Sequence, residues 1–439
     1  MLHRHASFCQ EEDPSMRFEL ARRSLLAALL ATGSIFVAGC SLAADADSED
    51  EEVEATDDAI VDIDNSRVKR QSIGNCWLYA TASWAESLAK QVPGATELNM
   101  SESYWTYWHW FDQIANGAAS DEIQTGGWYA TAAEIIARYG IMNEGSFIPS
   151  EAAAEMSLRQ SAALAKMNAS LKTGALSTPE ARRDRLLVRK ELDKAFELAP
   201  NVVTQLNRVF GMSVTRTLDK STVSTRFTSI KRASDIKVRL RDPDTKEPVT
   251  ATLQDAIGTR SSSWSTYRTG RFAWQMASYP YAPSSRRTML ARLQRAMHDK
   301  QPVIMSWYVD FNALDSQGRF TAPPTTPGRQ GGHMVVVEDY QINDVPGFGT
   351  LEAGVNETRS EALQAALSSS AKIEFIRIKN SWGTYRPDRG FVLPGYHDLY
   401  MSYLDGPIKR CVQKDDDTGS TDDCRDATPL NDFVLPPGY

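Results

Sequence analysis

One cysteine in the first quarter of the chain has the surroundings of a catalytic thiol. Cys76 follows a Gly-Asn pair and precedes Trp77, where residues 76–91 predict a helix that Pro93 ends. A nucleophilic cysteine must be largely thiolate, and a helix N-terminus together with a nearby imidazolium lowers its pKa. By itself, a cysteine on an apolar helix is more often a core residue. The catalytic interpretation therefore requires a histidine that the fold brings close.

One histidine stands where a catalytic base is expected. Beyond residue 40 the chain has four, which are His109, His298, His333 and His397. His333 opens a strongly apolar predicted strand and follows Gly331 and Gly332, whose lack of side chains leaves room for a substrate chain. Strand ends of this kind commonly carry catalytic residues, so His333 is the preferred candidate.

A polar residue after another predicted strand supplies a group that would orient the base. Residues 379–383 read KNSWG, which places Asn380 at the end of the strand and Trp382 two positions later. An amide oxygen accepts an imidazole N–H, and an indole over that hydrogen bond shields it from water. These residues predict nucleophilic catalysis through a thiol, without a cofactor.

The elements that must position these residues change from helices to strands along the chain. Helices are predicted from Ser101, as N-cap, to about residue 115 and from about residue 128 to 139, where Gly140 ends the second. Residues 151–235 are charged and alanine-rich at helical spacing. A hairpin surrounds the Asp-Pro-Asp at 242–244, and another helix covers residues 288–301.

From residue 302 the pattern becomes that of strands, in the segments PVIMSWYV, HMVVVEDYQI, KIEFIRIKN and RGFVLP. Helices followed by strands predict an α+β fold with two segregated lobes. The segment after Cys411 is acidic and proline-rich, and it predicts irregular structure.

The distribution of charge argues against nucleic acid as the main partner. The chain has 439 residues and a net charge of −8. Residues 40–60 hold nine acidic residues and no basic one, whereas from residue 61 onward 44 Lys and Arg nearly balance 43 Asp and Glu. Nucleic-acid-binding proteins usually show a clear basic excess. The acidic run itself predicts a solvated tether.

The N-terminal segment predicts export and a lipid anchor. Arg17, Arg22 and Arg23 precede an apolar stretch of 13 residues from 25 to 37, which is short for a membrane span but suits an export signal. The sequence VAGC at 37–40 resembles the bacterial lipobox, which predicts lipidation of Cys40 and a location at the cell envelope, in the periplasm or on the cell surface. The alternative is a plain secretory signal cleaved nearby.

Export gives the remaining cysteines a simple assignment. In an oxidising compartment Cys411 and Cys424 can form a disulfide around the segment between them. Cys76 is then the candidate nucleophile. The chain has no C-x-x-C pair, so neither a structural zinc site nor another metal site is predicted.

Three motifs in this order resemble the papain-like cysteine peptidases. They are GNCW preceded by a glutamine, GGHMVVV and IKNSWG. The segments LNMSESYWTYWHW and TGGWYATAAEIIARYGIMNEGSFIP resemble further elements of the family, and GYHDLYMSYL is most similar to the bleomycin hydrolase branch. The resemblance spans about residues 67–405 and is specific in four blocks. It implies a helical left lobe, an antiparallel β-barrel right lobe and a peptide or protein substrate.

The resemblance also implies a role for each matching residue. Cys76 is the nucleophile, His333 the base and then the acid, and Asn380 orients His333. The side-chain amide of Gln71 joins the Cys76 backbone N–H in the oxyanion hole. Trp382 shields the His–Asn hydrogen bond. The predicted substrate-binding residues are Gly126, Gly127, Gly332 and Trp382.

Two departures from the family pattern leave other functions open. Gln71 and Cys76 are five positions apart where the family usually has six, and 257 positions separate Cys76 from His333 against about 130–150 in papain-like enzymes. The first departure allows a catalytically impaired surface binding module. An acyl transferase that uses the same residues is a second alternative.

The predicted organisation has six parts. They are a lipoprotein signal peptide (1–39), an acidic disordered tether (40–66), a helical lobe with the catalytic cysteine (67–150), a mainly helical insertion (151–300), a β lobe with the catalytic histidine and asparagine (301–410), and a tail with the disulfide (411–439).

Overall fold

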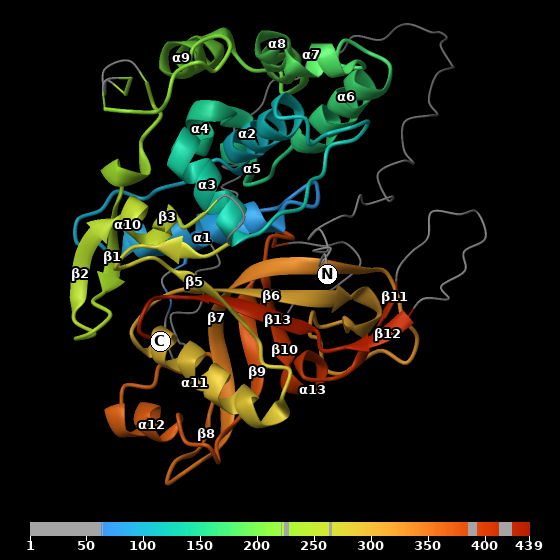
Figure 1. The fold of residues 1–439 in the computed structure, drawn as a ribbon. Helices are drawn as coiled ribbons and strands as arrows, with labels where there is room; N and C mark the ends of the chain where they lie inside the picture. Colours follow the sequence, from blue (N-terminus) through green and yellow to red (C-terminus); the bar gives the residue numbers. More distant parts are fainter. Residues whose placement is uncertain are drawn as a thin grey trace, which may run out of the picture.

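The structure is a computed structural model, and it describes residues 63, 65–220, 222–223, 228–262, 266–384, 393–411 and 424–439. The predicted signal peptide, Cys40, most of the tether and most of the RGFVLP strand lie outside these residues. Within them, helices gather above a sheet and helix α1 runs between the two (Figure 1). Helices α1–α9 come before the first strand, and the strands that follow form antiparallel sheets, which confirms the α+β class.

The first three helices begin and end close to the predicted positions. They are α1 (Cys76–Lys90), α2 (Glu102–Ala115) and α3 (Tyr129–Tyr139). The Ser101 hydroxyl caps α2 by accepting the Tyr104 backbone N–H at 3.1 Å. Gly140 ends α3 with a φ of 72°, a conformation that favours glycine. Nearly every side chain of α1 is buried, so this helix is central to the molecule.

The helices that follow pack on the same core. They are α4 (Glu144–Phe147), α5 (Pro149–Ala154), α6 (Gln160–Lys172), α7 (Pro179–Arg183), α8 (Arg185–Ala195) and α9 (Pro200–Phe210). The buried apolar side chains of α4, α6, α8 and α9 belong to one cluster with those of α1, α2 and α3. Phe196, for example, packs against Tyr107 and Trp110 of α2. The helical part of the predicted insertion therefore extends the core of the first lobe.

Beyond residue 211 the chain returns towards the sheet. The predicted hairpin is present as β1 (Lys237–Arg241) and β2 (Pro248–Thr252), preceded by the short helix η2 (Ala233–Asp235). After it come α10 (Leu253–Ile257), β3 (Thr259–Arg260), β4 (Arg268–Thr269), β5 (Gln275–Ser278) and α11 (Pro283–His298). Strand β5 joins the main sheet and α11 packs on it, so the end of the predicted insertion contributes to the β part.

The main sheet is antiparallel throughout and carries the candidate base. Its order is β10-β9-β7-β6-β13-β5, with β8 also paired to β7. The strands are β6 (Val303–Asp310), β7 (Gln330–Val345), β8 (Gly349–Leu351), β9 (Lys372–Lys379), β10 (Tyr396–Tyr400) and β13 (Leu430–Leu435). The β part also contains three short helices, which are η3 (Phe311–Ala313), α12 (Ser360–Ala365) and α13 (Met401–Leu404). A separate pair of strands, β11 (Ile408–Cys411) and β12 (Cys424–Ala427), completes it.

Alternate residues of β7 separate two apolar cores. Met334 and Val336 pack into the core that contains α1, whereas Val335 and Val337 pack into a second core on the other face. Helix α11 covers that second face (Figure 1). The strand is buried on both faces, which explains why its sequence is continuously apolar rather than alternating.

The irregular structure predicted after Cys411 is wrong for residues 424–435. Strand β12 pairs with β11, and β13 lies inside the main sheet between β6 and β5. Phe433 and Val434 are fully buried, one in each core. The many acidic residues and prolines of this segment suggested irregular structure. The segment LNDFVL at 430–435 is nevertheless long enough and apolar enough for one strand.

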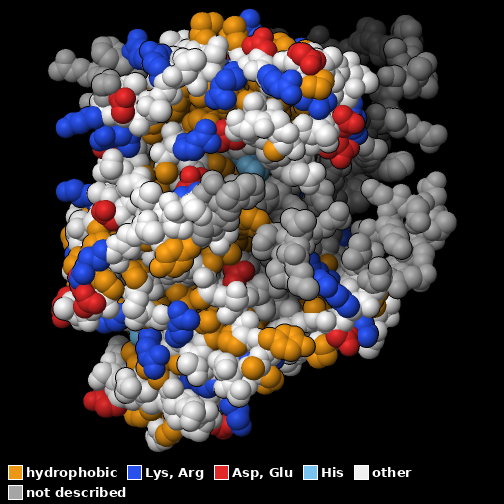
Figure 2. Space-filling model, viewed as in Figure 1, with side chains coloured by type: hydrophobic (Ala, Val, Ile, Leu, Met, Phe, Trp, Pro, Cys, Tyr) orange, Lys and Arg blue, Asp and Glu red, His pale blue; other side chains and the backbone are white. Residues whose placement is uncertain are grey.

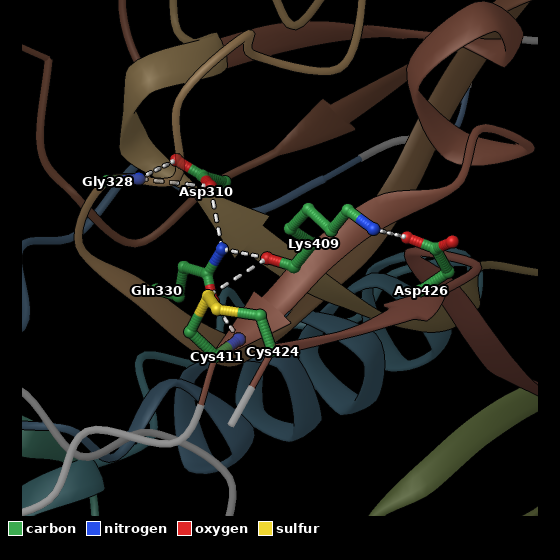
Figure 3. The surroundings of a disulfide bond; sticks show 7 residues. All are labelled: Asp310, Gly328, Gln330, Lys409, Cys411, Cys424 and Asp426. Atoms are coloured by element: carbon green, nitrogen blue, oxygen red, sulfur yellow. Dashed lines mark hydrogen bonds and ion pairs between the residues drawn. A yellow bond between two sulfur atoms is a disulfide. The ribbon is translucent and has the colours of Figure 1, made fainter. Parts of the chain in front are cut away.

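The strand pair β11–β12 is joined by a disulfide between Cys411 and Cys424 (Figure 3). Gln330, the first residue of β7, connects this pair to the sheet. Its amide oxygen accepts the Cys411 backbone N–H at 2.9 Å, and its Nε2 donates to the carbonyl of Lys409 at 2.6 Å. The same nitrogen donates to the buried carboxylate of Asp310 at 2.7 Å. The disulfide therefore braces the strand that carries His333.

The surface agrees with the near-neutral charge of the chain beyond the tether. Lys and Arg side chains are interspersed with acidic and apolar ones on the face shown in Figure 2. None of the helices in the described part of the chain is long and apolar enough to cross a membrane.

Candidate active site

The start of α1 presents Cys76 at the positive end of a helix. Asn75 is the N-cap residue, but its side chain makes no capping hydrogen bond. Its Nδ2 donates instead to Thr106 Oγ1 at 2.9 Å and to Gln160 Oε1 at 2.8 Å. The first backbone N–H groups of a helix have no partner within the helix, so they can stabilise a negative charge near Cys76.

The fold brings Cys76 to the strand that carries His333. The Met334 backbone N–H donates to Cys76 Sγ at 3.3 Å. Met334 follows His333 directly, so the sulfur lies against the backbone beside the candidate base although the two residues are 257 positions apart. This contact fixes the relative position of α1 and β7 at the site.

The hydrogen bond between His333 and Asn380 defines the chemistry of the imidazole. His333 Nε2 lies 2.7 Å from Asn380 Oδ1, and the Ser381 backbone N–H lies 2.7 Å from the same Oδ1. A backbone N–H can only donate, so the atom that it meets is the amide oxygen, and His333 Nε2 must then carry its hydrogen. In the neutral imidazole the lone pair is therefore on Nδ1, which is the atom that can accept a proton.

Aromatic rings enclose this hydrogen bond. The His333 ring stacks on Trp382 with 4.9 Å between centroids and an interplanar angle of 26°. The Trp307 ring contacts the His333 ring edge-on, with 6.2 Å between centroids. Phe311 packs against Trp382, with 5.3 Å between their ring centroids. Burial lowers the pKa of His333 from 6.5 to about 4, and the Asn380 hydrogen bond opposes this shift.

Gln71 is attached to both sides of the site. Its backbone N–H donates to the Ser381 carbonyl at 2.9 Å, and its Oε1 accepts the Ser381 hydroxyl at 2.5 Å. Its Nε2 donates to the Ile73 carbonyl at 2.8 Å and retains a second hydrogen. The short connection between Gln71 and Cys76 therefore consists of bends, and the hydroxyl of Ser381 orients the side-chain amide of Gln71.

Two buried lysines behind the site were not identified from the sequence. Lys69 Nζ donates to Glu102 Oε1 at 3.0 Å. Burial alone would lower the pKa of Lys69, but the carboxylates of Glu102, Glu86 and Glu144 outweigh it and hold this pKa well above its usual range. Lys379 Nζ donates to the hydroxyls of Ser66 and Ser83, each at 2.9 Å. Because Ser83 belongs to α1 and Lys379 precedes Asn380, this lysine ties the asparagine strand to the cysteine helix.

A small cavity of about 10 Å³ lies among these groups. It is lined by Lys69, Tyr79, Ala80, Ser83, Met334, Val335, Lys379, Asn380 and Ser381. A volume of this size holds roughly one water molecule. In the sequence, the two lysines are visible only as charged residues beside apolar motifs. Nothing in the sequence indicates which charged residues are buried next to one another.

The glycines that were predicted to bind substrate have different surroundings. A Cβ on Gly127 would meet the Trp77 ring at 2.5 Å, so the indole beside Cys76 requires a glycine there. Gly126 is half-buried in the same segment, and its backbone contacts the ring of His109. Gly332 pairs with Tyr308 of β6 immediately before His333. Packing accounts for Gly127 without a substrate.

The described residues contain no group of three or more His, Cys, Asp or Glu side chains that could hold a metal ion.

The comparisons with known proteins give little beyond this geometry. No family model and no curated protein matches the chain. Among solved structures, xylellain, a cysteine protease from Xylella fastidiosa, is 12% identical with a TM-score of 0.33, covering 85% of this chain and 84% of its own. PepW from Lactobacillus rhamnosis is 12% identical with a TM-score of 0.39, covering 87% and 82%.

Proposed function

We propose that the chain is a papain-like thiol peptidase that hydrolyses peptide bonds through Cys76, His333 and Asn380. One observation carries the proposal. The Cys76 sulfur at a helix N-terminus lies against the backbone next to a histidine whose Nε2 is held by an asparagine oxygen and covered by Trp382. A core cysteine needs none of these neighbours, whereas a thiol nucleophile needs all of them.

The arrangement supports a complete acyl-transfer cycle. His333 Nδ1 takes the proton of the Cys76 thiol, and the sulfur attacks the substrate carbonyl carbon. The helix N-terminus and the second hydrogen of Gln71 Nε2 stabilise the resulting oxyanion. Protonated His333 gives its proton to the leaving amine as the C–N bond breaks and a thioester forms. His333 then deprotonates water, whose oxygen attacks the thioester carbon. The C–S bond breaks to release the carboxylic acid, and His333 returns the proton to the Cys76 sulfur.

The activity is tested with the purified chain after treatment with a reducing agent, so that Cys76 is present as a thiol. A mixture of internally quenched peptides should be cleaved, and an epoxysuccinyl probe should add to Cys76. Cys76→Ala is the control for both measurements. Absence of cleavage with retained peptide binding would instead indicate the binding module. A product that contains an added amine, formed at the expense of hydrolysis, would indicate the acyl transferase.

We also propose that the enzyme acts at the bacterial cell envelope, anchored through lipid on Cys40. The lipobox-like VAGC and the acidic tether support this location. The expected result is incorporation of labelled palmitate into the wild type and a membrane-bound activity that Cys40→Ser releases. Incorporation of label into Cys40→Ser, or wild-type activity in the soluble fraction, would contradict the anchor.

A further inference from the structure

Five aromatic side chains form a closed cycle that includes the catalytic base. Ring centroids are 4.9 Å apart for His333 and Trp382, 5.2 Å for Trp382 and His397, and 6.4 Å for His397 and Phe320. Phe320 lies 4.8 Å from Trp307, whose ring is 6.2 Å from His333. His333 therefore contacts the indoles of Trp382 and Trp307. His397 and Phe320, which contact each other, connect these two indoles on the side away from His333.

His397 is itself fixed in position. Its Nδ1 lies 2.6 Å from the Gly318 carbonyl oxygen, which can only accept, so Nδ1 carries a hydrogen and the ring cannot turn without losing this bond. His397 lies in β10, which continues from Gly395, and the Gly395 carbonyl accepts the Asn380 backbone N–H at 2.9 Å. One short segment therefore holds both the asparagine backbone and the ring that abuts Trp382.

A polar side chain at this position is not explained by packing alone. His397 is only 3% exposed and its neighbours Phe320 and Trp382 are aromatic, so an apolar ring would fill the site without the desolvation of an imidazole. The bond to Gly318 offsets that desolvation and sets the angle of the ring. The imidazole thus contributes orientation in addition to volume.

We propose that His397 is a positioning residue that holds Trp382 against His333 and so keeps the His333–Asn380 hydrogen bond closed. This inference rests on the proposed function. Trp382 is half-buried, and the described rings that contact it include His333, Phe311 and His397, which restrict its rotamer. A tilt of the indole would expose the His333–Asn380 bond to water.

Among the described residues, the titratable and charged groups on elements next to His397 include His333, the Asp398–Arg377 pair of β10 and β9, and the Asp315–Arg319 pair of the loop that carries Gly318. A positive charge on His397 lowers the pKa of His333. Removing the imidazole therefore has two effects on the base, because it loosens Trp382 and also removes a neighbouring titratable group.

Two substitutions separate the ring from its hydrogen bond. His397→Asn keeps a nitrogen donor near Gly318 but removes the ring, and His397→Phe keeps a ring but loses the donor. His298→Asn is the control, because His298 is a half-buried histidine that also makes a 2.6 Å hydrogen bond, to Tyr340, and lies in α11. All three are expected to lower the melting temperature by similar amounts.

The kinetic readout distinguishes positioning from folding. We expect kcat for peptide cleavage to fall about tenfold in His397→Asn with little change in KM, because a misplaced base slows chemistry more than binding. His397→Phe should lose less, and His298→Asn should retain wild-type kcat per folded molecule. Equal kcat per folded molecule in His397→Asn and His298→Asn would overturn the inference.

A second readout does not depend on turnover. The Nε2 hydrogen of His333 should give a downfield proton signal that exchanges slowly with solvent in the wild type and in His298→Asn, and that Asn380→Ala removes. Faster exchange in His397→Asn supports the inference, and unchanged exchange overturns it. If the wild type shows the slow signal but cleaves no peptide, the proposed function fails while the positioning role of His397 is still decided.

Discussion

The two sides of the candidate site are built in different ways. On the sheet side, His333 is held by Asn380 and enclosed by Trp382 and Trp307, so its position is fixed by neighbours on several strands. On the helix side, Cys76 and Gln71 depend on the start of one helix and on a connection of five positions. The candidate base is thus enclosed by aromatic side chains, whereas Gln71 is held mainly by hydrogen bonds to Ser381 and Ile73, and Cys76 is buried at the start of α1.

This contrast identifies where activity would be lost with least damage to the fold. Changes on the sheet side remove buried aromatic contacts and affect stability as well as rate. Changes near Gln71 alter an amide at the edge of the site while both cores remain intact. Ser381 matters to both sides, since its backbone orients Asn380 and its hydroxyl orients Gln71.

The largest effect should come from the two residues that we propose exchange the proton. Cys76→Ala or His333→Ala should each lower kcat/KM by about 10⁴-fold or more, and the double variant should be no worse than either one, because residues that act as a unit are not additive. The measurement is cleavage of the best quenched peptide. Residual activity within tenfold of wild type in either variant would contradict the proposed pair.

On the helix side, Gln71→Ala should lower kcat by about 10²-fold, since removal of one oxyanion donor typically costs that much or more. Gln364→Ala, at an exposed position of α12, is the control and should leave kcat unchanged. A near-wild-type kcat for Gln71→Ala would mean that the hydrogen bond of Nε2 to Ile73 is its whole role.

The burial of His333 predicts a low acid limit for activity. His333 must be neutral to accept the Cys76 proton, and burial lowers its pKa from 6.5 to about 4. The rate should therefore hold as pH falls through 6 and decline about tenfold per pH unit only below about 4. Initial rates of Cys76 alkylation in this range, with the fold checked by circular dichroism, measure the midpoint. A midpoint near 6.5 would show a solvated imidazole.

The smallest effect is expected at the residue that links the two sides. Ser381→Ala removes the hydroxyl that donates to Gln71 Oε1 but keeps the backbone bonds to Asn380 and Gln71. One neutral hydrogen bond contributes about 1 kcal/mol, so kcat should fall about fivefold. Combining Ser381→Ala with Gln71→Ala should add nothing further. A full additional fivefold loss would place the hydroxyl in another role.

The sequence predicted the parts of the molecule that depend on local pattern. Ser101 and Gly140 marked helix ends because capping is a local interaction, and the apolar run after His333 marked a strand buried on both faces. Cys76, His333 and Asn380 were proposed because each stands at the end of such an element. Their meeting in space was expected only through the order of the motifs.

Interactions between distant segments were beyond the sequence. Nothing near Lys379 indicates that its ammonium reaches Ser83, and nothing near His397 indicates a ring contact with Trp382. Gly127 suggested room for a substrate, although its small size is required by Trp77. Strand β13 was missed because the segment that contains it has the composition of a tail, while its partners β5 and β6 lie more than a hundred residues earlier.

The position of β13 has a consequence for biosynthesis. This strand lies between β5 and β6, yet residues 430–435 are the last of the sheet to leave the ribosome. Until then β6 exposes an unpaired edge, and an exposed edge of this kind invites aggregation or chaperone binding. We therefore expect nascent chains stalled before residue 430 to be captured by chaperones and degraded, and the nucleophile to be silent until the sheet closes around its base.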